Sequence, residues 1–195
     1  MLNRVKRSEE TRAHITAAAA DALAEHGYDG VRMQDVARRA GMTTGAIYAH
    51  FDGRAELIAA AVESRVSCVL VGELRAEIDG RPLPERLADL AVRMLADPTA
   101  VAHPLEIEAL VGARREPELS DLLGLRLNML HEAFADRITA AQGRGELAAD
   151  VDPRSATYFL HALLLGMLLL DPVAEDRPDA DSWSHFVGRL VAGLS

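Results

Sequence analysis

Residues 33–51 of this 195-residue chain read MQDVARRAGMTTGAIYAHF, and this stretch decides the fold. Its apolar residues lie where two short helices that cross steeply need a shared miniature core: Val36, Ala40, Met42 and Ile47. Gly41 stands between the two helices, at a turn where a positive φ is easiest for glycine. The pattern is that of a helix-turn-helix, although any two short helices joined by a glycine share part of it.

The second of these helices, expected from about Thr44 to His50, has features of a helix that enters the DNA major groove. Either Thr43 or Thr44 can cap it, so that its free N–H groups and positive dipole end face the phosphates. Its outer face is lean because it carries small residues: Gly45, Ala46 and Ala49. Tyr48 and His50 can donate hydrogen bonds to phosphate oxygens.

Helical periodicity continues through the rest of the chain. An apolar stripe (Ile15, Ala18, Ala19, Ala22 and Leu23) predicts a first helix from about Ser8, its N-cap, to His26, ended by Gly27. Similar stripes predict a long helix over 54–78 and further helices near 87–95, 103–113, 123–138, 153–170 and 183–194. Aromatic residues make up only 4% of the chain, and no strand-like alternation is sustained. We therefore expect an all-α protein of about nine helices.

The wider segment over residues 11–62 reads TRAHITAAAADALAEHGYDGVRMQDVARRAGMTTGAIYAHFDGRAELIAAAV. It resembles the DNA-binding domain of the tetracycline-repressor (TetR) family in several motifs at matching spacing. The resemblance implies base contacts by Gln34 and Thr44. It implies phosphate contacts by Thr43, Tyr48, His50 and Arg54, with Gly45 on the same helix surface, and core positions for Phe51 and Leu57.

The sequence departs from the family pattern in two respects. Arg32 stands where the family often has a Ser or Thr that caps the second helix, so we expect that helix to begin differently. Thr44 and Ala46 offer few long polar side chains, and direct base readout is therefore expected to be thin. Gln34, Tyr48 and sequence-dependent DNA shape would then supply part of the specificity.

The charge distribution agrees with a DNA-binding head and a separate body. Residues 1–60 hold eight basic and eight acidic residues, whereas residues 61–195 hold thirteen basic and twenty-two acidic ones, so the second part carries the whole net charge of −9. We predict a helix-turn-helix domain of three helices over 1–53, with a basic arm over 1–7 that contains Arg4, Lys6 and Arg7. A helical domain for effector binding and dimerisation is predicted over 54–195.

The helix expected near 156–170 is apolar almost all round, which requires cover on more than one side. One side is predicted to face a second copy of the chain, with the last helix joining it: Tyr158, Ala162, Leu165, Leu169, Trp183, Phe186 and Leu190. Leu163, Leu164 and Met167 would face the chain's own core. In the TetR family two such helices from each subunit form a four-helix dimer interface. A larger monomeric core is the alternative.

The resemblance also implies a small-molecule effector held in the helical body. Flexible or amphipathic side chains expected on inward faces are the candidates: Met94, His103, Met129, Phe134 and His161. Each could equally be ordinary core packing. The expected function is a homodimeric repressor that binds a palindromic operator and is released by a mainly apolar effector, with activation as an open alternative.

Other chemistry finds no support in the sequence. The histidines form no local metal-ligand spacing, Gly143–Ala148 matches GxGxxA without a preceding strand, and no nucleophile elbow or P-loop occurs. We expect no cofactor, no metal and no enzymatic activity; a helical enzyme and a protein-interaction adaptor remain the rival classes. One cysteine, Cys68, and no apolar signal core indicate the cytoplasm. The longest apolar run, Ala162–Leu170, is too short to span a membrane.

Overall fold

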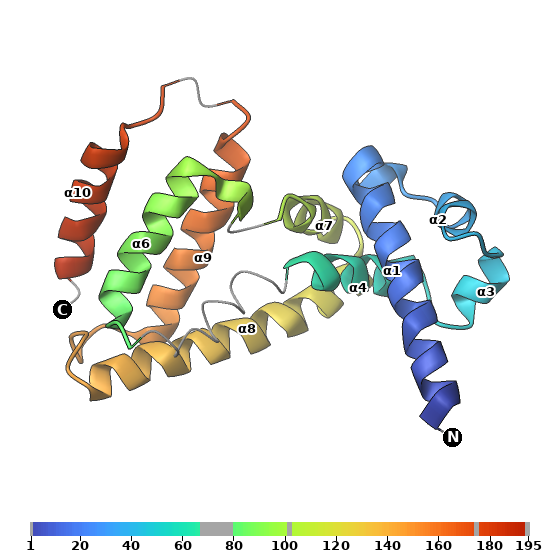
Figure 1. Cartoon of the computed structure of the whole chain (residues 1–195), viewed down its shortest axis with the longest axis horizontal. Helices are drawn as coiled ribbons and strands as arrows, with labels where there is room; N and C mark the ends of the chain where they lie inside the picture. The colour runs from blue at the N-terminus through green and yellow to red at the C-terminus, as the bar shows by residue number, and fades with distance from the viewer. Residues whose placement is uncertain (1, 67–79, 101–102, 174–175, 194–195) are drawn as a thin grey trace. The chain divides into compact units, whose positions relative to one another are not determined.

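The computed structural model describes residues 2–66, 80–100, 103–173 and 176–193. Over these residues it contains nine α-helices, one short 3₁₀ helix and no strand, which confirms the all-α prediction (Figure 1). The predicted end of the fourth helix at residue 78 and the lone Cys68 lie outside the described ranges. Contacts divide the chain into two compact units, Met1–Ser67 with Pro104–Arg126, and Cys68–His103 with Leu127–Ser195.

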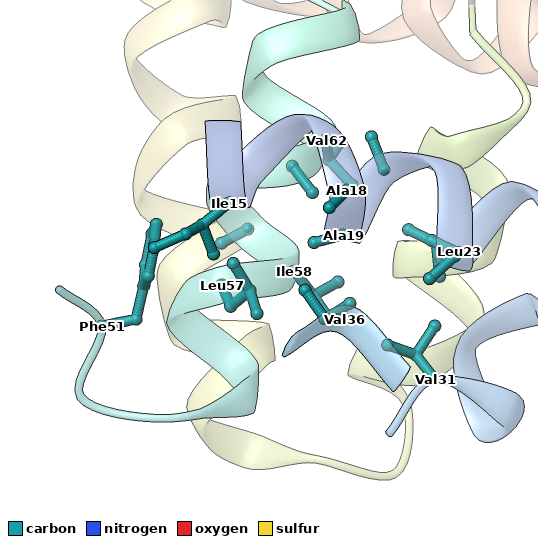
Figure 2. Packing of buried hydrophobic residues seen from close by; sticks show 14 of the residues in the cluster. Ile15, Ala18, Ala19, Leu23, Val31, Val36, Phe51, Leu57, Ile58 and Val62 are labelled. Carbon is teal, nitrogen blue, oxygen red and sulfur yellow. The ribbon is translucent and has the colours of Figure 1, made fainter. Parts of the chain in front are cut away.

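The first unit contains the predicted helix-turn-helix. Its elements are α1 (Leu2–Gly30), α2 (Met33–Arg39), α3 (Thr44–Tyr48), α4 (Arg54–Val66), α7 (Leu105–Ala113) and the first part of α8 (Pro117–Gly143). Helix α1 packs against α2, α4 and α7 through the apolar stripe that its sequence predicted. Figure 2 shows Ile15, Leu57 and Ile58 meeting between α1 and α4, and each is fully buried.

The ends of α1 differ from the expectation in one respect. Ser8, predicted as its N-cap, lies inside the helix, because α1 already begins at Leu2 and no Gly or Pro interrupts residues 2–7. Gly27 behaves as predicted, since its φ of 65° breaks the helical conformation there before a last turn ends at Gly30. The predicted basic arm is therefore helical from Leu2 onward.

The second unit contains α6 (Leu83–Ala96), η2 (Pro98–Ala100), the rest of α8, α9 (Pro153–Leu170) and α10 (Ala180–Ala192). Helix α6 packs against α10, and the Trp183 Nε1–H donates a hydrogen bond to the carbonyl oxygen of Ala91 at 2.8 Å. Aspartates cap α9 and α10, where Asp152 accepts from the Ser155 N–H and Asp179 from the Ser182 N–H. A second apolar core lies here, formed by Leu83, Leu87, Phe134, Ile138, Ala141 and Leu147.

One glycine of the first unit permits a close approach between α7 and α1. A Cβ atom at Gly112 would overlap the ring of Tyr28, which is itself buried, whereas a Cβ at Gly124 on α8 would meet nothing within 4 Å. We expect Gly112→Ala to lower the free energy of unfolding by about 1–3 kcal/mol through overpacking. The matched variant Gly124→Ala should leave stability equal or raise it by up to about 1 kcal/mol through helix propensity. Chemical denaturation of both variants measures the difference, and equal stabilities would contradict this packing.

Candidate DNA-binding site

The turn between α2 and α3 is built as a helix-turn-helix requires. Gly41 has a φ of 63°, and the Met42 N–H donates to the carbonyl oxygen of Ala37 at 2.9 Å across the turn. Val36 and Ile47 are fully buried and fix the two helices on a common core, with Met42 packed against it. The miniature core predicted from the sequence is confirmed, and it supports α3 as a rigid element.

Thr43 is the residue that caps α3. It has an extended backbone, and its Oγ1 accepts a hydrogen bond from the Ala46 N–H at 3.2 Å. Sequence alone left Thr43 and Thr44 as equal candidates. Arg32 occupies the N-cap of α2 without any side-chain cap bond, in agreement with its departure from the family pattern.

Six of the seven residues expected at DNA belong to the helix-turn-helix or to the turn that follows it, and Arg54 does not. Gln34, Thr43, Gly45 and Tyr48 are exposed, while Thr44 and His50 are half-buried. They come from the first turn of α2, from α3 with its cap, and from the turn that follows α3. Tyr48 leaves 55% of its surface exposed although it is a large aromatic residue. An aromatic side chain exposed on a rigid helix is available to a partner.

Arg54 differs from the other predicted DNA contacts. Its guanidinium lies over the ring of Tyr28, 4.2 Å from the centroid, and donates to the Tyr28 carbonyl oxygen. Its Nη1 is 3.7 Å from Glu116 Oε2, and Tyr28 also donates its hydroxyl to Glu116. Burial lowers the pKa of Arg54, against the opposing effect of Asp29. These contacts give Arg54 an internal role that sequence reasoning did not anticipate.

His14 was also missed by the sequence analysis. Its Nε2 lies 3.1 Å from the carbonyl oxygen of Ala40, the C-cap residue of α2, so α1 holds the helix-turn-helix at its turn. The two residues are far apart in the chain, and no local pattern in the sequence marks such a pair.

Comparison with known proteins identifies the family. Residues 15–61 match the family described as "Bacterial regulatory proteins, tetR family". The HTH-type transcriptional regulator TtgR of Pseudomonas putida is 43% identical over 201 residues, which cover 94% of this chain and 92% of TtgR. The chain belongs to the tetR family. It is thus a DNA-binding transcriptional regulator, and DNA is its partner.

Two solved structures extend the similarity over nearly the whole tetR-family chain. Salmonella enterica GusR has a TM-score of 0.77 at 24% identity and covers 95% of each chain. NalD, described as the secondary repressor of the MexAB-OprM multidrug efflux pump in Pseudomonas aeruginosa, has a TM-score of 0.64 at 26% identity, covering 97% of this chain and 98% of NalD. At 24% identity, the similarity to GusR supports the fold alone.

The residues predicted to bind an effector all lie in the second unit of this tetR-family chain, with different exposures. Met94, Phe134 and His161 are buried, and His103 is half-buried. Met129 was expected to face inward, and this is wrong because 65% of its surface is exposed. It precedes Phe134 by five residues, which places the two about 140° apart around α8.

The second unit also contains a cavity of about 620 Å³ between α8 and α9, lined by Asn128, His131, Glu132, Arg154, Ser155 and Tyr158. None of the five predicted effector residues lines it. His161 is linked to it, since its Nδ1 lies 2.9 Å from Nε2 of His131. Sequence reasoning missed this cavity because its lining comes from two distant segments.

The predicted dimer face is exposed in the single chain to a large extent. Tyr158, Ala162 and Leu169 on α9 are exposed, as are Phe186 and Leu190 on α10, while Leu165 and Trp183 are half-buried. The buried stripe of α9 consists instead of Thr157, His161, Leu164 and Leu168. Of the three residues expected to face the chain's own core, Leu164 does so, and Leu163 and Met167 are half-buried.

Proposed function

We propose that this regulator is a repressor that binds a palindromic operator as a homodimer and leaves it when a small-molecule effector binds. The observation that carries the proposal is the structure of α3. This helix is capped by Thr43, is packed on the core through the buried Ile47, and exposes Tyr48 on its surface. Two copies related by a two-fold axis would reach half-sites roughly 34–36 Å apart. Repression follows when the operator overlaps a promoter.

The proposed DNA contacts are those on and beside α3. Gln34 and Thr44 would read base edges, while Thr43, Tyr48 and His50 would bind phosphate oxygens. Gly45 would allow the close approach of the helix to the groove. Arg54 is not included, because its guanidinium is engaged by Tyr28 and Glu116. DNA binding is thus assigned to residues 1–53, with α4 and α7 as its support, and the remaining functions to 54–195.

The proposed dimer forms through α9 and α10. Tyr158, Leu169, Phe186 and Leu190 expose between 48% and 70% of their surfaces, and a group of large apolar side chains in water indicates a partner. Helix α9 is also long and apolar enough to cross a membrane, by length and composition only. We favour a second copy of the chain over a membrane as the partner of α9, because His161 in the middle of this helix is buried and pairs with His131 of α8.

The effector is proposed to bind in the second unit, where Met94, Phe134 and His161 are buried and His103 is half-buried. An inducer must bind the DNA-incompetent arrangement more tightly than the DNA-bound one. A mainly apolar compound fits the apolar core, whereas the cavity beside His131 offers polar contacts. We place the protein in the cytoplasm and assign it no enzymatic activity.

Substituting one exposed apolar residue should separate the subunits. We expect Phe186→Arg to yield monomers, because it puts a charge into a desolvated interface. Ser184→Arg is the matched control, since residue 184 is exposed and lies about 160° around α10 from Phe186. Analytical ultracentrifugation checks both variants. A stable dimer of Phe186→Arg would contradict the proposed interface.

Selection of duplexes from random DNA tests the proposed function. The wild-type protein should enrich a palindrome, and its affinity should fall steeply as salt rises. Absence of any salt-dependent binding to a selected duplex would favour a protein-interaction adaptor. Chemical conversion of a bound small molecule would favour a helical enzyme.

A further inference from the structure

The C-terminal end of α3 is held by a single arginine of α1. The guanidinium of Arg12 donates to the carbonyl oxygen of His50, two residues after the end of α3, and lies 4.0 Å from the centroid of the Phe51 ring. Phe51 is buried, so this contact fixes the guanidinium plane over a rigid surface. A flat cation with several donors suits such a site, because it can stack and donate at the same time.

Glu56 of α4 completes the arrangement. Its Oε1 accepts from Arg12 Nη2 at 2.7 Å, and its Oε2 accepts from the Asp52 N–H at 2.6 Å. Burial acts to raise the pKa of Glu56, but the hydrogen bonds from Arg12 and Asp52 outweigh it and lower that pKa. The carboxylate is therefore charged at neutral pH. Through its two oxygens, Glu56 links its own helix, α4, to α1 and to the segment that follows α3.

We propose that Arg12 and Glu56 are positioning residues for DNA recognition, which set the direction of α3 by holding residues 50–52. This rests on the proposed function of α3, and it adds two residues that contact no DNA themselves. Arg12 donates to the backbone of residue 50 and stacks on the side chain of residue 51, while Glu56 accepts from the backbone of residue 52. A small rotation of this segment would displace both Tyr48 and His50 from their partners.

A direct phosphate contact by Arg12 is the competing explanation, because 43% of its side chain is exposed. The two explanations differ in the sign expected for Glu56→Gln. This change removes a negative charge near DNA, so simple charge effects predict equal or tighter binding. A glutamine amide has only one oxygen, however, and one of the two donors would then face an NH₂ group. The positioning role predicts DNA binding about tenfold weaker.

The experiment uses the 195-residue chain and the duplex that the wild-type protein selects from random DNA. Affinity is measured from low to high salt for wild type, Glu56→Gln and Arg12→Lys, after thermal unfolding has shown that each variant is folded. Both variants are expected to bind about tenfold more weakly with the slope of log affinity against log salt unchanged. The lysine keeps the charge but cannot both stack and donate in two directions.

Glu25→Gln is the matched control. Glu25 forms an exposed bidentate pair with Arg39, at 2.8 and 2.5 Å, that does not involve residues 50–52. Its loss should leave DNA affinity within about twofold of wild type.

Three outcomes would overturn the inference. These are unchanged or tighter binding by Glu56→Gln, full affinity of Arg12→Lys, and a salt slope lower by about 0.9 for each phosphate that a variant no longer neutralises. Failure of the wild-type protein to select any duplex would instead overturn the proposed function, so the two failures are distinguishable.

Discussion

Replacing Tyr48 by alanine is expected to weaken binding to the selected operator by about 100-fold while the dimer stays folded. A charge-assisted hydrogen bond to phosphate contributes about 1.5 kcal/mol or more, and the dimer would lose two of them. Stability should change little, because 55% of the surface of Tyr48 is already exposed to solvent. Fluorescence anisotropy with a labelled duplex measures the affinity.

Two further variants test whether the loss comes from the Tyr48 hydroxyl. Tyr48→Phe keeps the ring and removes only the hydroxyl, so it should bind nearly as weakly as alanine if the hydroxyl donates to phosphate. Val111→Ala, at an exposed apolar position of α7 in the same unit, should bind like wild type. Wild-type affinity in Tyr48→Ala would remove Tyr48 from the DNA-binding surface.

Replacing Ile47 by alanine should cause the largest loss of stability among these variants. Ile47 is the fully buried residue of α3, and its truncation leaves a cavity that costs about 2–5 kcal/mol. Operator binding should fall as well, since α3 loses the side chain that packs it against the core. Ile47→Val removes a single methylene and should cost about 0.5–1.5 kcal/mol.

Urea denaturation, monitored by circular dichroism, gives both values. A loss below about 1 kcal/mol for Ile47→Ala would show that α3 does not rest on this side chain. A loss for Ile47→Val equal to that for Ile47→Ala would show that cavity size does not govern the effect.

Local chemistry made much of the recognition unit predictable. Periodicity identified the buried stripe of α1, and the need for a positive φ identified Gly41 as the turn residue. A glycine in a turn and an apolar residue on a helix face are determined by near neighbours in the chain. These features therefore appear in the sequence alone.

Features that depend on distant segments were not predictable. The partners of Arg54 are Tyr28 on α1 and Glu116, which directly precedes α8, and the His50 carbonyl oxygen that Arg12 binds lies far along the chain from it. The exposure of Met129 depends on which side of α8 is covered, and the sequence pattern around it did not resolve this. Thr43 and Thr44 are equivalent as cap candidates until the backbone conformation is known.

The most direct test of the account is a footprint of the wild-type protein on its selected duplex, combined with the number of chains bound. We predict two chains for each duplex and protection of two major-groove segments, whose centres lie about one helical turn, or a whole multiple of it, apart. Protection that shifts when Gln34 or Thr44 is replaced would assign the base contacts. A single protected segment bound by one chain, or protection unaffected by any change in α3, would contradict the account.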